Sequence, residues 1–354
     1  MNKFRSFLQR KDIVFSSKRY FQDALSAMAL GLFASLLIGL IIKTLGEQTI
    51  NLIGGEETSL ETLKYIADFL IEVGGTAMGL MGAAIGIAVA WGLKAPPLVM
   101  FASAITGMMG ATLGGPAGSF LAAAFGAEFG KAVSKETKVD IIVTPAVTLI
   151  IGMIAAKLFG PLVSALMTGL GKVIMNATEM APFTFGIIIS VIVGLVLTAP
   201  ISSAALCIML DLSGLAAGAA TVGCCAQMIG FAVISFRENG VGGLLAQGLG
   251  TSMLQVSNII KNPWILVPPT LAAAIVGPMA TVIFNMTNIA AGAGMGTSGL
   301  VGQIGTFTDM GFTLPVLGEV LLLHFLLPAI FALLIDMALR RWGKIKPGDY
   351  KLDL

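Results

Sequence analysis

Long stretches without a charged residue are the feature that most constrains how this chain can fold. Residues 95–127 and 262–308 contain no Asp, Glu, Lys or Arg, and charged residues make up only 11% of the 354 residues. Soluble domains carry about 25% charged residues, and the smaller share found here cannot coat a globule of this size in water. The chain must therefore fold in a lipid bilayer, which excludes a soluble enzyme, a nucleic-acid-binding protein and a disordered regulator.

Apolar runs predict the membrane-spanning helices, each of which needs roughly 20 residues to cross the hydrocarbon. The expected spans are 24–42, 76–93, 141–159, a short returning span at 161–172, 180–210 with a break near Pro200, 214–234, 265–284 and 314–339. The predicted fold class is an all-α polytopic membrane protein with about eight transmembrane helices and two or three re-entrant hairpins.

Glycine marks where the chain is expected to turn back inside the bilayer. The 44 glycines concentrate in residues 107–130, 240–250 and 292–305. Residues 95–127 lie between Lys94 and a second basic group that begins at Lys131. Because basic residues favour the cytoplasmic side, a single crossing would end on the wrong side. We therefore predict that this segment enters and returns, and that residues 241–260 and 285–308 make similar excursions.

Charge at the two ends predicts the domain organisation. Residues 1–22 carry six basic residues before the first apolar run, and five more follow residue 339. The positive-inside rule places both termini in the cytoplasm. We expect a cytoplasmic segment at 1–22, a transmembrane domain at 23–339 and a cytoplasmic tail at 340–354. The first segment is either an amphipathic helix on the inner leaflet or a frayed cytosolic arm.

Polar residues inside apolar stretches mark candidate sites, because a polar group in hydrocarbon is costly without a partner. The glycine-rich stretch ending at Ser119 forms either an anion- or hydroxyl-binding turn or a tight helix crossing. A second group lines a hydrated cavity or belongs to a cytoplasmic loop. It comprises Thr251, Ser252, Gln255 and Asn258.

Two further groups complete the candidate site. The third offers amide donors and acceptors that suit a sugar or polyol, or that satisfy the backbone of their own loop. It comprises Asn285, Asn288, Thr297, Ser298 and Gln303. The fourth is Glu319 with His324, the only histidine in the chain. His324 is either a hydrogen-bonded packing residue or a substrate contact or proton-coupling group.

No recognised catalytic, nucleotide or metal motif accompanies these residues. The chain has no Walker loop, no paired zinc ligands and no nucleophile elbow. We therefore predict no cofactor, no metal and no autonomous catalytic site.

Several stretches resemble enzyme IIC, the membrane component of the bacterial sugar phosphotransferase system, particularly its fructose-type branch. The closest sub-group is the stand-alone IIC-like membrane proteins. The similar stretches are Ala90-Trp-Gly-Leu-Lys-Ala-Pro-Pro97, Gly118-Ser-Phe-Leu-Ala-Ala-Ala-Phe-Gly126, Lys138-Val-Asp-Ile-Ile-Val-Thr-Pro145 and Asn262-Pro-Trp-Ile-Leu-Val-Pro-Pro269.

This resemblance implies a function and partners. It implies a homodimer in the bacterial plasma membrane that carries a sugar or small polar solute by an elevator movement. It also implies phosphorylation of that sugar by soluble IIA and IIB proteins, so the chain is at most a permease component of an enzyme system.

The chain departs from the family at two functional motifs. The family's Gly-Ile-Thr-Glu motif, whose Glu contacts the sugar, corresponds to Gly248-Leu-Gly-Thr251. The His of the fructose-type Pro-His-Gly-Gly run is absent near Ala291–Gly294. A threonine hydroxyl can bind a sugar hydroxyl but cannot act as a base. Three functions therefore stay open: a phosphotransferase-type carrier, a carrier that does not phosphorylate, and a ligand-sensing membrane regulator.

Overall fold

The computed structural model describes residues 3–53, 60–199 and 202–352 of the chain. Its internal contacts divide the chain into two compact units, Met1–Met167 and Thr168–Leu354, which we call the N-terminal unit and the C-terminal unit. In the described residues the structure is helical, and its β-structure is an isolated bridge between Gly214 and Asn288. The predicted all-α class is confirmed.

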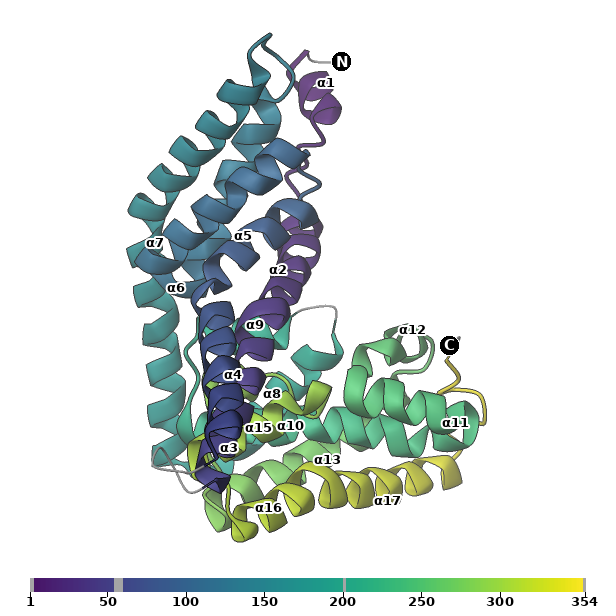
Figure 1. The fold of residues 1–354 in the computed structure, drawn as a ribbon. Coiled ribbons are helices and arrows are strands. Elements are labelled where there is room, and N and C mark those ends of the chain that lie inside the picture. Colours follow the sequence, from purple (N-terminus) through teal and green to yellow (C-terminus); the bar gives the residue numbers. More distant parts are fainter. Residues whose placement is uncertain (1–2, 54–59, 200–201, 353–354) are drawn as a thin grey trace. The chain divides into compact units, whose positions relative to one another are not determined.

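The N-terminal unit consists of the helices shown in Figure 1, and glycines such as Gly39, Gly74 and Gly86 let them approach one another closely. They are α1 (Lys3–Arg10), η1 (Lys18–Ala24), α2 (Leu25–Leu32), η2 (Phe33–Leu37), α3 (Ile38–Leu52), α4 (Glu61–Gly79), α5 (Met81–Gly92), α6 (Pro97–Val133) and the first part of α7 (Asp140–Met180).

Helix α6 is a hairpin, as predicted for residues 95–127. Its backbone leaves helical geometry at Gly114 and Gly115 (φ 57°, ψ −155°). A Cβ added to Gly110 would lie 2.4 Å from the carbonyl oxygen of Gly118, and one added to Gly130 would lie 2.9 Å from the Val99 side chain. Residues 8 and 31 positions apart thus lie in contact, because the two halves of α6 run antiparallel. Each half has roughly the length of the hydrocarbon core.

Six acidic residues against two lysines predict an outside loop at residues 43–72, and both this loop and the span at 76–93 need correction. Helix α3 continues to Leu52 and α4 begins at Glu61, so most of the expected loop is helical. Residues 54–59, which include Glu56 and Glu57 of that prediction, lie outside the described part. The expected span is a bent pair, in which α4 and α5 meet at 49°.

The predicted return at residues 161–172 is wrong. Helix α7 runs without interruption from Asp140 to Met180, with Pro145 and Pro161 inside it. A proline removes one backbone hydrogen bond and pushes on the preceding turn. Because apolar residues continue on both sides of Pro161, the helix tolerates the proline and does not reverse there.

The C-terminal unit surrounds one buried helix, α10 (Gly214–Ile234). Its other elements are the end of α7, α8 (Pro182–Thr198), α9 (Ser203–Met209), α11 (Phe236–Leu245), η3 (Ala246–Gly250), η4 (Ser252–Gln255), α12 (Val256–Lys261), η5 (Pro263–Leu266), α13 (Val267–Pro278), η6 (Met279–Ile283), α14 (Ala290–Ala293), η7 (Ser298–Leu300), α15 (Val301–Met310), α16 (Leu314–Val320), η8 (Leu321–Leu326) and α17 (Leu327–Arg341).

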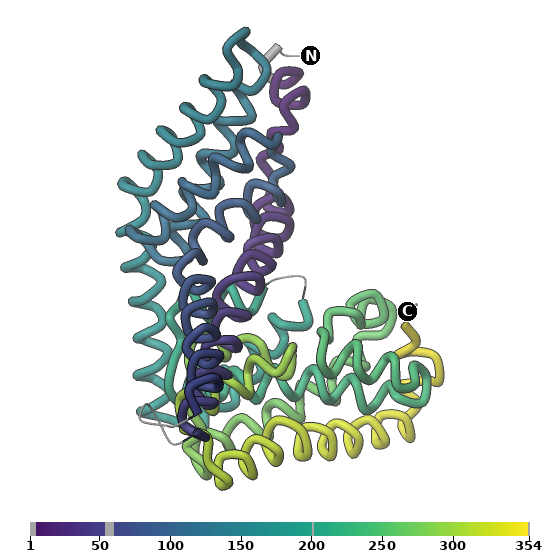
Figure 2. The backbone as a smooth tube through the Cα atoms, viewed as in Figure 1, coloured from purple at the N-terminus to yellow at the C-terminus, as the bar shows by residue number. Residues whose placement is uncertain are grey.

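Helix α10 is lined by small residues on all sides, which is typical of a fully buried helix. It packs against α8, α13 and α17, whose paths Figure 2 shows. Gly223 approaches the Ser190 backbone of α8 so closely that an added Cβ would lie 2.0 Å from its carbonyl oxygen. Small residues allow this close approach where helices gain little from hydrophobic burial in lipid.

The break predicted in 180–210 is present, between Thr198 and Ser203. Pro200, to which we assigned it, lies outside the described residues. The two segments predicted to enter the membrane and return, 241–260 and 285–308, both consist of short helices and turns and contain no long helix. The first consists of short helices with a kink at Gly240, and the second contains turns before α15.

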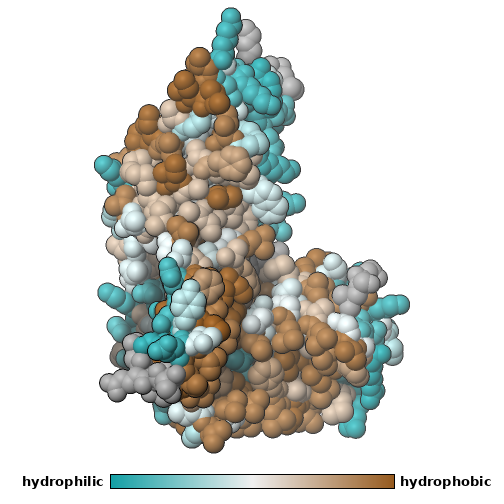
Figure 3. Space-filling view, in the orientation of Figure 1, coloured by the Kyte–Doolittle hydropathy of each residue, from teal (hydrophilic) through white to brown (hydrophobic). Residues whose placement is uncertain are grey.

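Within the described ranges, six helices are long and apolar enough to cross a membrane, or seven if the bent α4–α5 pair forms one span. The predicted number of about eight is therefore not confirmed. The surface supports a lipid environment. Figure 3 shows a hydrophobic surface over α16 and α17 that becomes hydrophilic near the C-terminal end of α17. Large side chains are exposed along it, among them Leu314, Leu321, Leu326 and Leu334.

We expect Gly115→Ala to destabilise the α6 hairpin. At Gly115 an added Cβ meets no atom within 4 Å, so the cost comes from the left-handed backbone (φ +57°) alone. Such strain costs about 1–3 kcal/mol. Thermal unfolding of the detergent-purified protein measures it. The control is Gly75→Ala on α4, where the backbone is helical and an added Cβ also meets nothing. Equal melting temperatures for the two variants would show that the turn does not need glycine.

Candidate functional site

Three of the four predicted polar groups meet in the C-terminal unit. They come from η3–η4, from the loop between η6 and α15, and from η8. Residues of these segments are buried and hydrogen-bonded to one another, which is the arrangement that polar groups at membrane depth require. We call this set the buried polar layer. Its side chains are Asn288, Thr297, Gln303, His324, Gln247, Ser252 and Gln255, all at most 5% exposed.

Asn288 holds the loop between η6 and α15 against α10. Its backbone N–H and C=O pair with Gly214 at 3.3 and 3.0 Å. Its side-chain Nδ2 lies 2.7 Å from Thr221 Oγ1, 2.9 Å from the Gly302 carbonyl oxygen and 3.1 Å from Thr306 Oγ1. Both threonine hydroxyls donate to carbonyls of their own helices, so their oxygens accept from Asn288.

Glycine makes room for the Asn288 amide. A Cβ added to either Gly292 or Gly305 would lie 2.4 Å from Asn288 Oδ1. The same oxygen accepts from the backbone N–H of Ile289 at 2.7 Å. The glycine-rich sequence of this loop therefore serves the packing of one buried amide.

Thr297 connects this loop to η3. Its hydroxyl donates to the carbonyl oxygen of Gly248 at 2.5 Å. The preceding Gly296 has φ +55° and lies against the backbone of Cys224 and Cys225. The two glycine-rich segments that the sequence singled out, 248–258 and 285–303, are thus in direct contact.

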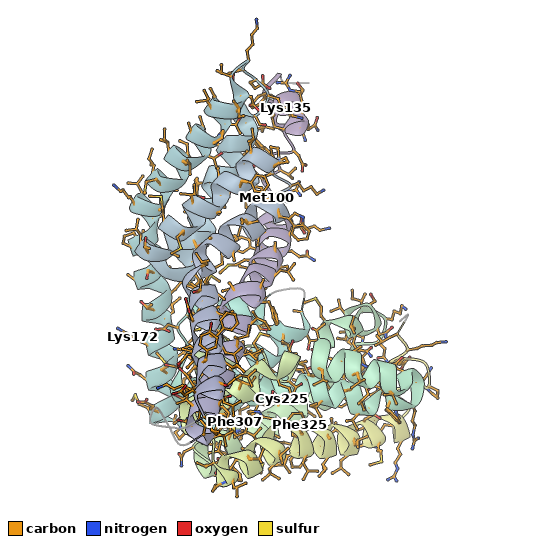
Figure 4. All side chains as sticks on the ribbon, in the orientation of Figure 1. Met100, Lys135, Lys172, Cys225, Phe307 and Phe325 are labelled. Carbon is orange, nitrogen blue, oxygen red and sulfur yellow. The ribbon has the colours of Figure 1, made fainter. Side chains whose placement is uncertain are left out.

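Gln303 joins the loop to His324. Gln303 Nε2 lies 3.0 Å from His324 Nδ1 and 3.5 Å from Cys225 Sγ, a residue labelled on α10 in Figure 4. Because an amide NH₂ only donates, Nδ1 accepts and the ring proton lies on Nε2, 3.1 Å from Met286 Sδ. Gln303 Oε1 is buried and has no hydrogen-bond partner among the described residues.

Ser252 and Gln255 lie in a neighbouring part of the layer. Ser252 Oγ is 2.8 Å from Thr198 Oγ1, at the end of α8. Gln255 Nε2 donates to Gln247 Oε1 at 2.9 Å, and Asn258 donates to Gln255 Oε1 at 2.8 Å. Since Gln247 and Gly248 both belong to η3, this short turn connects the two parts of the layer.

The C-terminal tail closes the layer through Tyr350. This side chain is fully buried, and its hydroxyl donates to Asp336 Oδ1 at 2.8 Å. Its carbonyl oxygen accepts from Gln255 and Asn239 at 3.0 and 2.8 Å. Burial first, and then the charge of Asp336, raises the pKa of Tyr350 far above its usual range, so the hydroxyl keeps its proton and donates.

The other predicted site residues lie elsewhere or make local contacts. Ser119 belongs to the N-terminal unit, where its hydroxyl donates to Gly82 O at 3.0 Å, which agrees with the helix-crossing alternative. Asn285 is exposed, with a left-handed backbone at φ 44°. Thr251 Oγ1 caps η4 by accepting from Met253 N. Ser298 and Glu319 are half-buried, and Glu319 Oε2 has no partner among the described residues.

Sequence reasoning missed Gln247 of the layer and three residues that support it: Thr221, Gln227 and Tyr350. Thr221 and Gln227 are the polar side chains in the small-residue run of α10, and their isolation there was the available signal. Tyr350 gave no signal, because a tyrosine in a charged tail is usually exposed.

We expect Asn288→Ala to destabilise the C-terminal unit, because the Thr221, Thr306 and Gly302 oxygens lose their shared donor. A buried group left unpaired costs about 1–3 kcal/mol. Thermal unfolding should show a clear drop relative to Thr308→Ala on the exposed side of α15, whose hydroxyl bonds only within its helix. A melting temperature equal to that control would show that Asn288 does not hold the loop.

Tyr350→Phe should also destabilise the protein, by about 1–3 kcal/mol, since Asp336 Oδ1 loses its donor. The matched control is Tyr65→Phe, at an exposed tyrosine. Limited proteolysis provides a second measurement, because a released tail is cleaved faster. If the tail of the Tyr350 variant is as resistant to proteolysis as that of the control, the hydrogen bond from Tyr350 to Asp336 does not hold the tail in place.

Comparison with known proteins identifies the family. No curated protein and no solved structure matches the chain. A family model described as "Phosphotransferase system, EIIC" matches residues 22–352. That match covers nearly all of the described part, including both units and the buried polar layer. The chain therefore belongs to the phosphotransferase system EIIC family and is a multi-pass membrane component of sugar transport.

Proposed function

We propose that this protein carries a sugar or a small polar solute across the membrane, and that the solute binds at the buried polar layer of the C-terminal unit. Gln303 Oε1 carries the proposal. It is an acceptor buried without a partner, while Nε2 of the same amide is fixed by His324. An unpaired buried acceptor costs about 1–3 kcal/mol, and a solute hydroxyl donating to it would remove that cost.

The neighbouring groups suit a polyhydroxylated solute. Amides and hydroxyls supply both donors and acceptors without a fixed charge, and Thr297, Ser252 and Gln255 add such groups within the same layer. Asn288 and Thr251 contribute as positioning residues, because their polar atoms already serve the loop and the η4 cap. The half-buried Ser298 and Glu319 supply further polar groups on the segments beside the layer.

We propose a mechanism and partners on the strength of the family. A substrate-carrying part moves against a scaffold part in a homodimer, and separate IIA and IIB proteins phosphorylate the sugar. Both termini then face the cytoplasm. The basic ends of the chain support that orientation by the positive-inside rule.

A carrier that does not phosphorylate is the second candidate, and one observation favours it. Thr251 stands where the family's Glu is expected, and its hydroxyl caps η4 by accepting from the backbone N–H of Met253 at 3.1 Å. A hydroxyl in this role binds but does not accept a proton from a sugar at neutral pH. Direct solute movement down a gradient needs no such base.

Uptake into proteoliposomes tests the proposal and separates the two candidates. The wild-type protein is assayed with a panel of labelled sugars and polyols, with and without phospho-donor IIA and IIB proteins. Gln303→Leu should weaken binding about tenfold, which corresponds to about 1.4 kcal/mol, whereas Thr308→Ala should bind as the wild type does. Phosphorylated product identifies the first candidate and free internal solute the second. If no solute binds or moves, both are wrong.

A further inference from the structure

Two pockets border the N-terminal segment of the N-terminal unit. One is apolar, with a volume of about 560 Å³. Its walls come from the N-terminal segment and the second half of α6, and they include Phe7, Leu8, Phe120, Phe125 and Phe129. Phe125 and Phe129 are 39% and 50% exposed, so the pocket opens to the surroundings of α6.

The second pocket, about 460 Å³, is strongly basic. Five cationic side chains and two acidic ones line it. The cationic residues are Arg10, Lys11, Lys94, Lys131 and Lys135.

Three of these cations are already paired. Arg10 and Lys11 share Glu136 at 3.0 and 2.5 Å, and buried Lys131 pairs with Glu128 at 3.0 Å. Among the described residues no carboxylate lies within ion-pair distance of Lys94 or Lys135.

Lys94 and Lys135 are exposed and sit at chain turns after α5 and α6, with φ of 57° and 61°. Asp140 accepts from the backbone N–H of Lys135, at 2.6 Å. Even with that carboxylate counted, the pocket keeps an excess of positive charge. Figure 4 shows Lys135 at the same end of this unit as α1.

Residues that line the two pockets are neighbours in the sequence at two places. Phe7 and Leu8 line the apolar pocket while Arg10 and Lys11 line the basic one. On α6 the order repeats, since Phe129 belongs to the first pocket and Lys131 to the second. The apolar pocket suits an acyl chain, and the unpaired Lys94 and Lys135 suit a phosphate. A single molecule that carries both groups would therefore use both pockets. A free anion would leave the apolar cavity unused, and a polar peptide would not fill it.

We propose that these pockets bind one anionic phospholipid. An acyl chain enters the apolar pocket, and Lys94 and Lys135 hold the phosphate at the cytoplasmic interface, where anionic lipid attracts basic side chains. The lipid would join α1, the start of η1 and the end of α6, which ion pairs of Glu136 and hydrogen bonds of Tyr20 and Lys131 already connect. This site is independent of the solute site in the C-terminal unit.

Native mass spectrometry of the detergent-purified full chain tests the site. Phosphatidylglycerol should be retained in a one-to-one complex at least tenfold more than phosphatidylcholine with the same acyl chains. Inorganic phosphate and glycerophosphoglycerol should not compete at equal concentration. Equal retention of the two lipids would show that the protein binds lipid there without selecting for the headgroup, as annular lipid is bound. Competition by the free headgroups would make it an anion site. Either result overturns the proposal.

Matched variants locate the binding. Lys94→Gln with Lys135→Gln should lower phosphatidylglycerol retention about tenfold. Lys261→Gln with Lys346→Gln, which removes the same charge from exposed lysines of the C-terminal unit, should not. Ala132→Trp, which fills the apolar pocket, should lower retention of both lipids. Thermal unfolding verifies that each variant is folded. Unchanged retention in both the lysine pair and the Ala132 variant would show that the lipid binds elsewhere.

Discussion

Hydrocarbon offers no hydrogen bonds, and this constraint shapes the C-terminal unit more than any other. A loop of glycines and amides inside an apolar unit is costly unless the protein itself supplies most of its hydrogen-bond partners. Asn288 meets that requirement by bonding α10, α15 and its own loop at once. Thr297 then attaches the loop to η3, and Gln247 continues the chain of hydrogen bonds to Gln255 and the C-terminal tail.

The same constraint explains which atoms remain for a ligand. Most polar atoms of the layer are satisfied within the protein, so they hold the structure in place. Gln303 Oε1 is the exception that lies beside His324. The proposed solute site in this unit therefore depends on a hydrogen-bonded frame, to which Asn288 and Tyr350 belong, around a small number of free acceptors. The Thr251 hydroxyl is already used to cap η4. This contact argues against Thr251 taking over the role of the family's sugar-contacting Glu.

Charge and glycine patterns predicted part of this structure for identifiable reasons. Lys94 and Lys131 on either side of a charge-free run required a reversal, and Gly114–Gly115 supplied it. Pro161 suggested a second reversal that does not occur, because a proline only kinks a helix when apolar residues continue beyond it. Polar residues in apolar surroundings correctly pointed to segments 248–258 and 285–303. The same pattern could not tell which asparagine is buried, Asn288 or Asn285, three residues earlier. One is fully buried and the other exposed, and only the tertiary packing of Thr221 and Thr306 decides between them. Burial of Tyr350 could not be predicted from the sequence either, because it also depends on tertiary packing.

Photoaffinity labelling tests the central claim most directly. A photoreactive analogue of whichever solute binds is cross-linked to the full chain in membranes, and the labelled peptides are identified by mass spectrometry. The account predicts labelling in 285–303 and around His324, with loss of label when unlabelled solute competes. Competed labelling confined to residues 1–167 would place the solute in the N-terminal unit and contradict the account.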